Sequence, residues 1–593
     1  MSDITQPIFL EWRSLTSAGL YPSIRNGPTP RAPVMTHNCA SDRDCERFPA
    51  YYGPATRVLL LGGAMAVNVN LDALIPRADF DILGVENASQ SQPPSTMTIR
   101  DLERGTGFFF ATLRKPDFQR ETASWSPQKV TDFIKTFVTG DLIPAIILWR
   151  APGHTFVIDG SHRLSALIAW VNEDYGDGEI SRDFFTHLIV PTQEKVAERT
   201  RRMIKAEVGS YKDHQFALHN PQKSKPAVAE RAKLLGQISV ALQWVSGNSA
   251  KAEASFFKIN QEAVPIDKTE LRLLKARNHP NALAARAIIR AGTGHKYWSG
   301  FDGGKQQEIE SLAREIHENL FTPLLSTPIK TLDLPVAGQS YSSQTLPLVF
   351  ELVNVANDHN NGNVLGDDLS GVETIKFMKG VRKISDRIAG AHPSSLGLHP
   401  VVYFYSVEGR FQPTSFLAVI SLVKSFDKEN LFHTFTTHRR DFEEFLLKHK
   451  GWTIQVVGKW GSGLKGFDKL KDLYRLILDG VIAGKSESKI RASVLTNPVF
   501  DFLAAKPITK TEVGRDFSKE TKSQAFIRKA IDSPVRCNIC GARLHLKSIS
   551  IDHDLRKDDG GIGELDNAQP THPFCNTGYK EKMAALAATQ SGA

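Results

Sequence analysis

Residues 537–576, CNICGARLHLKSISIDHDLRKDDGGIGELDNAQPTHPFCN, carry the most specific pattern in the chain. The stretch begins with a Cys-x2-Cys pair, Cys537 and Cys540, and closes with a His-x2-Cys pair, His572 and Cys575. Two thiolates at this spacing fit on one turn and bind tetrahedral zinc. The two pairs together therefore predict a structural zinc site. A zinc ribbon that only braces a fold is the alternative interpretation of these pairs.

The residues between and after the zinc pairs predict a strand, a loop and a helix. Residues 548–551 alternate like a short strand and run directly into Asp552 and His553. A polar loop containing two adjacent glycines follows this acid–histidine pair. Residues 579–589 are rich in good helix formers, so the segment is expected to end in a helix.

This order of elements resembles the HNH endonuclease family, whose fold is a ββα-metal unit. The resemblance implies that His553 is the general base for attack on a DNA phosphate. It implies that Asp552 and Asn576 hold a catalytic Mg²⁺ or Mn²⁺, while the zinc ion is structural. It also implies that Asn567 holds the loop so that His553 points at the phosphate.

These residue types suit phosphodiester hydrolysis. The reaction needs a base that is active near neutral pH, and histidine is the natural choice. It also needs a cation that offsets charge on the phosphate and on the leaving oxygen. One carboxylate and one amide suit a hard cation and leave positions for water and phosphate.

A second group of motifs lies in the first half of the chain. They are Gln119-Arg120 followed by Trp125, the run Asp159-Gly160-Ser161-His162-Arg163, and the segment FFKIN at residues 256–260. In this order they resemble the N-terminal domain of GmrSD-type restriction proteins, which belongs to the ParB/sulfiredoxin-like group. The resemblance covers roughly residues 98–275. It implies nucleotide binding, nucleotide hydrolysis and sensing of modified DNA.

The run that starts at Asp159 predicts a phosphate cradle. Asp159-Gly160 is expected to form a tight strand-to-helix turn, so that backbone amides and Arg163 face an anion. Asp159 is expected to hold Mg²⁺ or to position a water molecule. An ordinary turn with a surface arginine is the alternative when this run is taken alone. The residues assigned to nucleotide binding are Gln119, Arg120, Asp159, Gly160, Ser161, His162, Arg163 and Asn260.

The flanking pattern predicts a compact α/β domain around these motifs. Ser126-Pro127 is expected to open a helix that ends at Gly140, because serine caps helices and proline suits the first turn. Residues 143–149 and 156–158 are expected to be buried strands, and a further helix is expected at 164–171.

The predicted fold class is α+β with several domains. Helix is also expected over residues 228–245 and through most of 308–505, which contains no motif with an assignable role. The predicted divisions are an N-terminal extension (1–97), a ParB/sulfiredoxin-like domain (98–300), a mostly helical middle domain (301–505), a linker (506–524) and an HNH domain (525–593).

Bulk properties limit the class of protein. The 593 residues carry a formal charge of +9, which is compatible with a nucleic-acid partner but does not establish one. No apolar run approaches the roughly 18 residues of a membrane helix, and the N-terminus lacks a secretory pattern, so a cytoplasmic location is expected. Five cysteines do not form a disulfide framework, and Cys39 and Cys45 are expected to be free thiols.

The pairing of these two modules in one chain resembles type IV, modification-dependent restriction enzymes. The resemblance implies a bacterial defence endonuclease that acts on DNA, including modified phage DNA. Its expected cofactors are structural Zn²⁺, catalytic Mg²⁺ or Mn²⁺, and a nucleoside triphosphate at the N-terminal domain. The first alternative is a ParB-type DNA-binding regulator with a nucleotide switch and an inert zinc ribbon. The second alternative is an HNH enzyme that acts on RNA.

Overall fold

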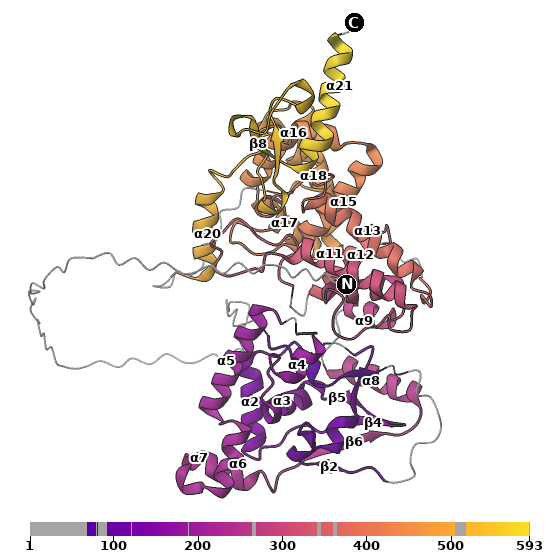
Figure 1. The fold of residues 1–593 in the computed structure, drawn as a ribbon, viewed down its shortest axis with the longest axis vertical. Coiled ribbons are helices and arrows are strands. Elements are labelled where there is room, and N and C mark those ends of the chain that lie inside the picture. The colour runs from indigo at the N-terminus through magenta and orange to yellow at the C-terminus, as the bar shows by residue number, and fades with distance from the viewer. Residues whose placement is uncertain are drawn as a thin grey trace, which may run out of the picture. The chain divides into compact units, whose positions relative to one another are not determined.

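The computed structural model describes residues 68–78, 80, 92–119, 121–187, 189–263, 268–340, 345–359, 365–503 and 517–591 (Figure 1). Cys39, Cys45 and Arg120 lie outside these residues, as does most of the N-terminal extension. Asn260 lies in helix α8 (Ser249–Ala263), but its side chain is outside the described part of the structure.

Among the described residues, six strands form a mixed sheet with the order β1-β3-β5-β4-β6-β2. The strands are β1 (Arg77–Ala78), β2 (Thr96–Met97), β3 (Leu113–Pro116), β4 (Ile146–Ala151), β5 (His154–Asp159) and β6 (Val240–Val245). The pairs β1–β3, β3–β5 and β4–β6 are parallel, whereas β4–β5 and β2–β6 are antiparallel. The predicted α/β character of this region is therefore confirmed.

Both faces of this sheet are covered. Along β5, Val157 packs into one hydrophobic cluster, whereas its neighbours Phe156 and Ile158 pack into another. This alternation follows from the period of two in a strand, and apolar residues at successive positions require cover on both sides. The helices of this part are α1 (Phe108–Thr112), α2 (Pro127–Val138), α3 (Ser161–Asn172), α4 (Glu179–Phe184), α5 (Pro191–Glu207), α6 (Tyr211–His219), α7 (Pro226–Leu234), α8 and α9 (Lys268–Lys275).

The helix expected from Ser126-Pro127 is confirmed as α2. The Ser126 hydroxyl accepts a hydrogen bond from Lys129 N at 3.2 Å, so it caps the helix as its sequence position predicts. The chain then turns at Gly140, which has a φ of +78°. The two expected strands are also present, as β4 and β5, and the expected helix after them is α3.

The helix expected over residues 228–245 is wrong in its second half. Helix α7 ends at Leu234, and residues 240–245 form strand β6 between β4 and β2. Val240 and Leu242 are buried while Ala241 and Gln243 are exposed, which is the period of a strand and not of a helix. Pairing with β4 favours the extended form over the local helical tendency of the segment.

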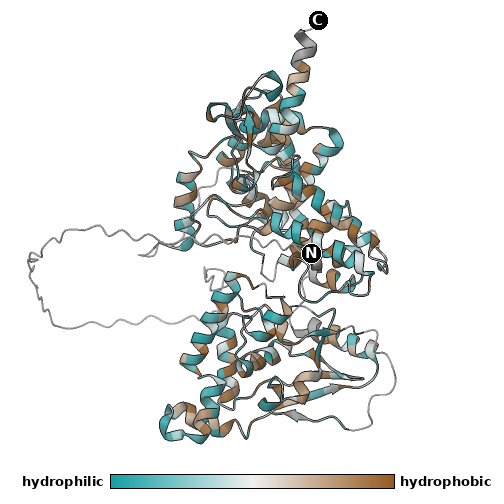
Figure 2. Cartoon of the chain, in the orientation of Figure 1, coloured by the Kyte–Doolittle hydropathy of each residue, from teal (hydrophilic) through white to brown (hydrophobic). Residues whose placement is uncertain are grey.

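A helical region follows, and it has one continuous hydrophobic core. Buried residues from Leu273 to Tyr579 belong to this core, including Phe574 next to the second zinc pair. Figure 2 shows polar and apolar residues alternating along the helices, as amphipathic packing requires. These helices are α10 (Pro280–Ile289), α11 (Gly303–Phe321), α12 (Thr345–Ala356), α13 (Val372–Ile388), α14 (Pro400–Tyr403), α15 (Pro413–Glu429), α16 (Phe432–Lys448), α17 (Gly451–Trp460), α18 (Leu464–Ile482) and α19 (Glu487–Leu495).

The chain reaches its C-terminal segment through helix α20 (Lys519–Ala530), while residues 504–516 lie outside the described part. Strands β7 (Ser550–His553) and β8 (Ala568–Thr571) then form a separate antiparallel pair. A π-helical turn (Cys575–Tyr579) leads into helix α21 (Lys580–Ser591), where a helix is expected. Across the described residues, no helix combines the length and apolarity needed to span a bilayer.

Candidate functional site

Four metal-ligating side chains converge in the C-terminal segment. The ligand atoms of Cys537, Cys540, His572 and Cys575 all lie within 4.8 Å of one another. Nδ1 of His572 is 3.5 Å from the Cys540 Sγ and 3.7 Å from the Cys575 Sγ. Three thiols and one imidazole at these separations can bind a metal ion such as zinc. The structure therefore brings together the two pairs that the sequence separates by 31 residues.

Backbone hydrogen bonds orient these ligands. The N–H of Gly541 donates to the Cys537 carbonyl at 2.8 Å, and Gly541 has a φ of +69°, which closes the first knuckle. Nε2 of His572 lies 3.1 Å from the carbonyl of Arg543, so a proton on Nε2 leaves Nδ1 free to face the thiols. Burial lowers the pKa of His572, which favours the neutral imidazole that a metal needs.

The second pair of candidate metal ligands, His572 and Cys575, packs against the helical region. The N–H of Phe574 donates to the Ser395 carbonyl at 3.0 Å, and the Thr577 hydroxyl donates to the Pro393 carbonyl at 2.9 Å. Gly397 approaches so closely that a Cβ atom there would lie 2.9 Å from the His572 ring. The second zinc pair is thus held by the segment between α13 and α14 as well as by its own strands.

Asp552 lies in β7 opposite Gln569 of β8. The expected strand over residues 548–551 begins two residues later than predicted, so Asp552 and His553 lie within the strand. The Asp552 carboxylate is nearly buried, and its Oδ2 is 2.7 Å from Lys580 Nζ and accepts a 3.1 Å hydrogen bond from Gln569. Oδ1 of Asp552 accepts no hydrogen bond from the described residues.

His553 and Asn576 remain open to a ligand. The His553 ring is partly exposed and makes no hydrogen bond within the described part of the chain. The Asn576 side-chain amide donates to the Ser550 hydroxyl at 2.8 Å, which leaves its carboxamide oxygen without a described partner. An acid, an imidazole and an amide oxygen are therefore carried by two adjoining elements, β7 and the turn before α21.

Asn567 fixes the loop between β7 and β8. Its Oδ1 accepts a hydrogen bond from the Leu555 N–H at 2.6 Å, and its Nδ2 donates to the carbonyls of Leu555 and Ile562 at 3.1 and 2.8 Å. Its own carbonyl accepts from the Asp554 N–H at 2.9 Å. One side chain thus ties both ends of the loop that follows His553.

The N-terminal motifs meet at the start of α3. Gly160 adopts a φ of +92° between β5 and α3, and no side chain caps the helix that begins at Ser161. The Arg163 guanidinium forms an ion pair with Asp159 of the same motif. The expected tight turn is therefore present, with its acid and its arginine facing each other.

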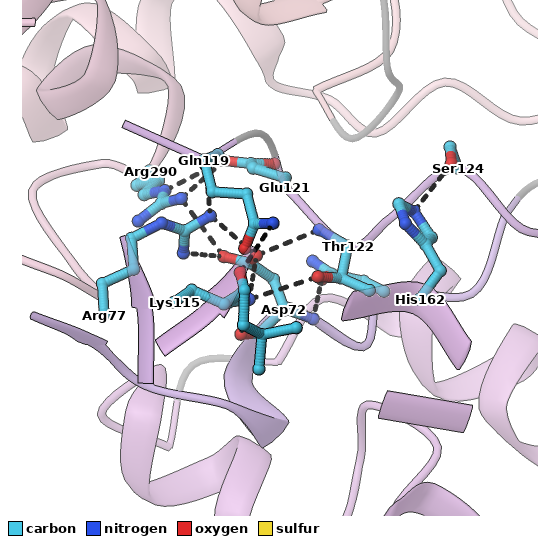
Figure 3. Close-up of polar contacts among 11 residues, drawn as sticks. Asp72, Arg77, Lys115, Gln119, Glu121, Thr122, Ser124, His162 and Arg290 are labelled. Atoms are coloured by element: carbon cyan, nitrogen blue, oxygen red, sulfur yellow. Dashed lines mark hydrogen bonds and ion pairs between the residues drawn. The ribbon is translucent and has the colours of Figure 1, made fainter. Parts of the chain in front are cut away.

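The first and second motifs are in direct contact. His162 Nε2 lies 2.7 Å from the Ser124 hydroxyl (Figure 3), and its ring stacks on Trp125 with centroids 5.7 Å apart. Gln119 is buried and donates to the Val157 carbonyl of β5 at 3.2 Å. Of the residues predicted for the nucleotide site, Gln119 and the run that contains His162 thus lie close to β5, whereas Arg120 and the Asn260 side chain are outside the described part of the structure.

A buried charged cluster that no sequence motif predicts lies beside these motifs (Figure 3). The Asp72 carboxylate forms ion pairs with Arg77 at 2.5 Å, Lys115 at 2.7 Å and Arg290 at 3.3 Å. Arg290 also forms an ion pair with Glu121 at 2.7 Å. Burial would raise the pKa of Asp72, but the three cations hold it well below its usual value. These residues follow no motif spacing, and only the position of Glu121 beside Gln119-Arg120 offers a signal in the sequence.

Comparison with known proteins gives one match. Residues 100–277 match the family model described as the N-terminal domain of the GmrSD restriction endonuclease. This segment contains strands β3 to β6 and all three N-terminal motifs. No curated protein and no solved structure matched the chain. The match therefore supports a GmrSD-type N-terminal domain and does not extend to the zinc cluster.

Proposed function

We propose that this protein is a DNA endonuclease of a restriction or antiviral-defence system, with an HNH-type site at its C-terminal end. The observation that carries the proposal is the set Asp552, His553 and Asn576 on β7 and the following helix start, beside the zinc cluster. The match of residues 100–277 to a restriction endonuclease domain supports the same biological role.

The donor atoms of this site fit a hard divalent cation. Oδ1 of Asp552 and the carboxamide oxygen of Asn576 are oxygen ligands without described partners, which suits Mg²⁺ or Mn²⁺. Lys580 Nζ lies 2.7 Å from Asp552 Oδ2, so a divalent ion at this carboxylate would use the other oxygen or displace the ammonium. A divalent ion bound here would offset negative charge on the phosphate and the leaving oxygen.

The protein side chains supply the remaining chemistry. His553 takes a proton from the attacking water at its ring nitrogen, because it is partly exposed and engaged in no other hydrogen bond with the described residues. Asn567 positions His553 indirectly by fixing the loop that leaves β7. The zinc cluster holds β8 and the start of the last helix in place, so that Asn576 stays beside β7.

We also propose that the N-terminal domain binds a nucleoside triphosphate at the start of α3. The first backbone amides of α3 have no side-chain cap, and such amides bind phosphate. Arg163 would exchange its partner Asp159 for a phosphate oxygen, which leaves Asp159 free to hold the Mg²⁺ of the nucleotide. Recognition of modified DNA by this domain is the companion proposal.

The nuclease proposal is tested by incubating the full chain with modified phage DNA, unmodified phage DNA and matched RNA. Each reaction contains Mg²⁺ or Mn²⁺, with and without each nucleoside triphosphate. We expect metal-dependent cutting of DNA by the wild type, and a loss of about 10²–10⁴-fold in rate for His553→Ala. Circular dichroism and zinc content of the variant should match the wild type.

Three results would reject the proposal. A folded, zinc-loaded and fully active His553→Ala protein would remove the assigned base, and the exposed histidine variant His219→Ala serves as the matched control. Intact DNA under every condition, with DNA binding retained, would favour the ParB-type regulator. Cleavage of RNA alone would favour the RNA-directed alternative.

A further inference from the structure

A small cavity lies beside the buried charged cluster and outside the cradle at Arg163. Its volume is about 110 Å³, and its walls include Arg77, Gln119, Arg286 and Arg290. Helix α10 and the residue that follows it contribute two of these arginines, and both lie beyond the segment that matches the GmrSD domain. The cavity therefore joins the end of β3 to the helical region.

Arg286 is the first sign that this cavity takes an anion. Its side chain is 3% exposed, yet no carboxylate of the described residues lies within ion-pair distance. Its contacts are a long 3.5 Å hydrogen bond to the Arg277 carbonyl and the Tyr297 ring, 4.2 Å away. Burial lowers its pKa, and a buried charge without an anionic partner is destabilising. Asp117 acts on this charge only from beyond ion-pair distance, so the folded protein keeps a buried arginine without a carboxylate in direct contact among the described residues.

Arg290 and Arg77 provide a second, independent sign. Both are 6% exposed, and both have a buried N–H group without any partner among the described residues, at Nη1 of Arg290 and Nε of Arg77. Native proteins leave few buried donors unsatisfied, and such donors call for an explanation. The two carboxylates here, Asp72 and Glu121, are already shared among several cations. The cluster therefore has more donors than its own acceptors can satisfy.

We propose that this cavity binds a phosphoryl group, with Arg286 and Arg290 as its principal ligands. Guanidinium groups bind phosphate oxygens through paired, charge-assisted hydrogen bonds. The cavity is well below the roughly 300–1,000 Å³ of pockets that enclose a whole drug-sized ligand. It therefore fits a free phosphate or the end of a nucleotide, and not a complete nucleotide.

The position of the cavity allows both sources of the phosphoryl group. Ser124 forms part of the cavity wall, and its hydroxyl is 2.7 Å from His162 in the run that contains Arg163. No residue of the C-terminal site lines this cavity, so phosphate binding here does not depend on the proposed nuclease activity.

The test is titration of the full chain with inorganic phosphate, followed by calorimetry and by thermal unfolding against chloride at equal ionic strength. We expect phosphate to bind the wild type and to raise its melting temperature. Arg286→Met should weaken phosphate binding by at least about tenfold, the loss of one charge-assisted contact. Without phosphate, this variant should melt at or above the wild-type temperature, because a buried unpaired charge is gone.

Control variants make the test decisive. Arg314→Met removes the same charge from an exposed position on α11 and should bind phosphate like the wild type. If Arg286→Met does not fold, Arg286→Lys replaces it, and an intermediate affinity is expected because one ammonium cannot make the paired contact. No phosphate binding by the wild type, or equal binding by the Arg286 variants, would overturn the proposal.

Titration of the same variants with ATP identifies the source of the phosphoryl group. Inorganic phosphate should bind Arg163→Gln as tightly as it binds the wild type. If ATP binding weakens in both the Arg163 and Arg286 variants, the cavity takes the terminal phosphate of a nucleotide. If ATP binding weakens only in Arg163→Gln, the cavity takes a free anion. If Arg163→Gln loses phosphate binding while Arg286→Met retains it, phosphate binds at Arg163 and not in the cavity, which would contradict the proposal.

Discussion

Lys580 gives the Asp552 carboxylate a positive partner that belongs to the protein itself. The two side chains are 19% and 8% exposed, so water screens their attraction poorly. Water also screens repulsion poorly at this position, so an ammonium group and a divalent cation bound to the same carboxylate repel each other strongly. Lys580 is therefore expected to compete for Asp552 with the divalent metal proposed for this site, and to hold the carboxylate in place when that metal is absent.

Lys580→Gln is expected to bind Mn²⁺ several-fold more tightly than the wild type, because the competing charge is removed while a hydrogen-bond donor remains. Calorimetric titration with Mn²⁺ measures the effect without relying on cleavage. Lys582→Gln, two residues along the same helix and exposed, is the control and should bind like the wild type. Weaker Mn²⁺ binding by Lys580→Gln would instead make Lys580 a positioning residue for Asp552.

The sequence predicts the composition of the C-terminal site better than its electrostatics. Cys537, Cys540, His572 and Cys575 follow a spacing typical of metal binding, so their convergence is expected from the order of residues alone. Lys580 belongs to no such spacing, since lysines are common in helices. Its role depends on the register between β7 and α21, which only the folded chain defines. The Asp72 cluster is hidden for the same reason, because its members come from distant segments.

At the scale of elements, the turn between β5 and α3 depends on a single glycine. Gly160 combines a φ of +92° with crowding, because a Cβ atom there would lie 2.5 Å from Ile146 Cδ1 and 3.2 Å from Arg163 Nη2. Gly153, in the turn between β4 and β5, also has a positive φ but has open space around it. Substitution at Gly153 therefore tests backbone strain alone, whereas substitution at Gly160 tests backbone strain together with steric conflict.

Gly160→Ala should therefore lower the free energy of unfolding more than Gly153→Ala. Both substitutions carry the penalty of a left-handed conformation, but only the first overpacks its surroundings, which typically costs about 1–3 kcal/mol. Chemical denaturation of both variants gives the difference. Equal losses would mean that Ile146 and Arg163 move aside without cost.

The zinc site proposed at Cys537, Cys540, His572 and Cys575 is expected to hold further elements together. Cys540→Ser should lose one equivalent of zinc and loosen β7, β8 and the last helix, because metal binding contributes to folding. Elemental analysis and hydrogen exchange over residues 537–580 measure both effects. Purified wild-type protein without zinc would refute the assignment.

Local signals predict some elements of this fold and fail for others. The cap at Ser126 and the proline after it determine where α2 begins, so the helix is predictable from a few neighbouring residues. Residues 240–245 contain no such signal, and their state is set by pairing with β4, about 90 residues earlier in the chain. Partners that are distant in sequence decide the strand, which is why the expected helix is wrong there.

At the scale of the whole molecule, the helical region buries ionisable groups that make stability depend on pH. Burial lowers the pKa of Lys450 to about 7, and its ammonium donates to the Val402 carbonyl. The unfolded chain has an ordinary lysine pKa near 10.4, so it binds more protons than the folded chain between these values. The free energy of unfolding therefore rises as the pH increases from about 7 towards about 10.4. Below pH 7 the folded chain bears the full cost of burying the charged ammonium of Lys450.

Lys450→Met is accordingly expected to stabilise the protein most at or below pH 7. The gain should be at least about 1.4 kcal/mol, the value of one pKa unit, and should shrink as the pH rises to 9 and above. Denaturation of the full chain at several pH values provides the measurement. Lys448→Met, exposed and two residues earlier, should show no such trend over the same range. A gain that grows with pH would contradict the burial of a charged Lys450.

The contacts that fasten the second zinc pair to Ser395 and Pro393 have a consequence for where on a DNA molecule a cut would fall. A nuclease on a flexible tether samples many positions, so its cuts scatter over a range set by the length of the tether. Here Phe574 and Tyr579, which flank the start of the last helix, are part of the same core as the helical region. If the helical region contacts DNA, the distance along the DNA from that contact to the cut should therefore be fixed. Sequencing of the cleaved DNA ends should show one such distance rather than a broad distribution.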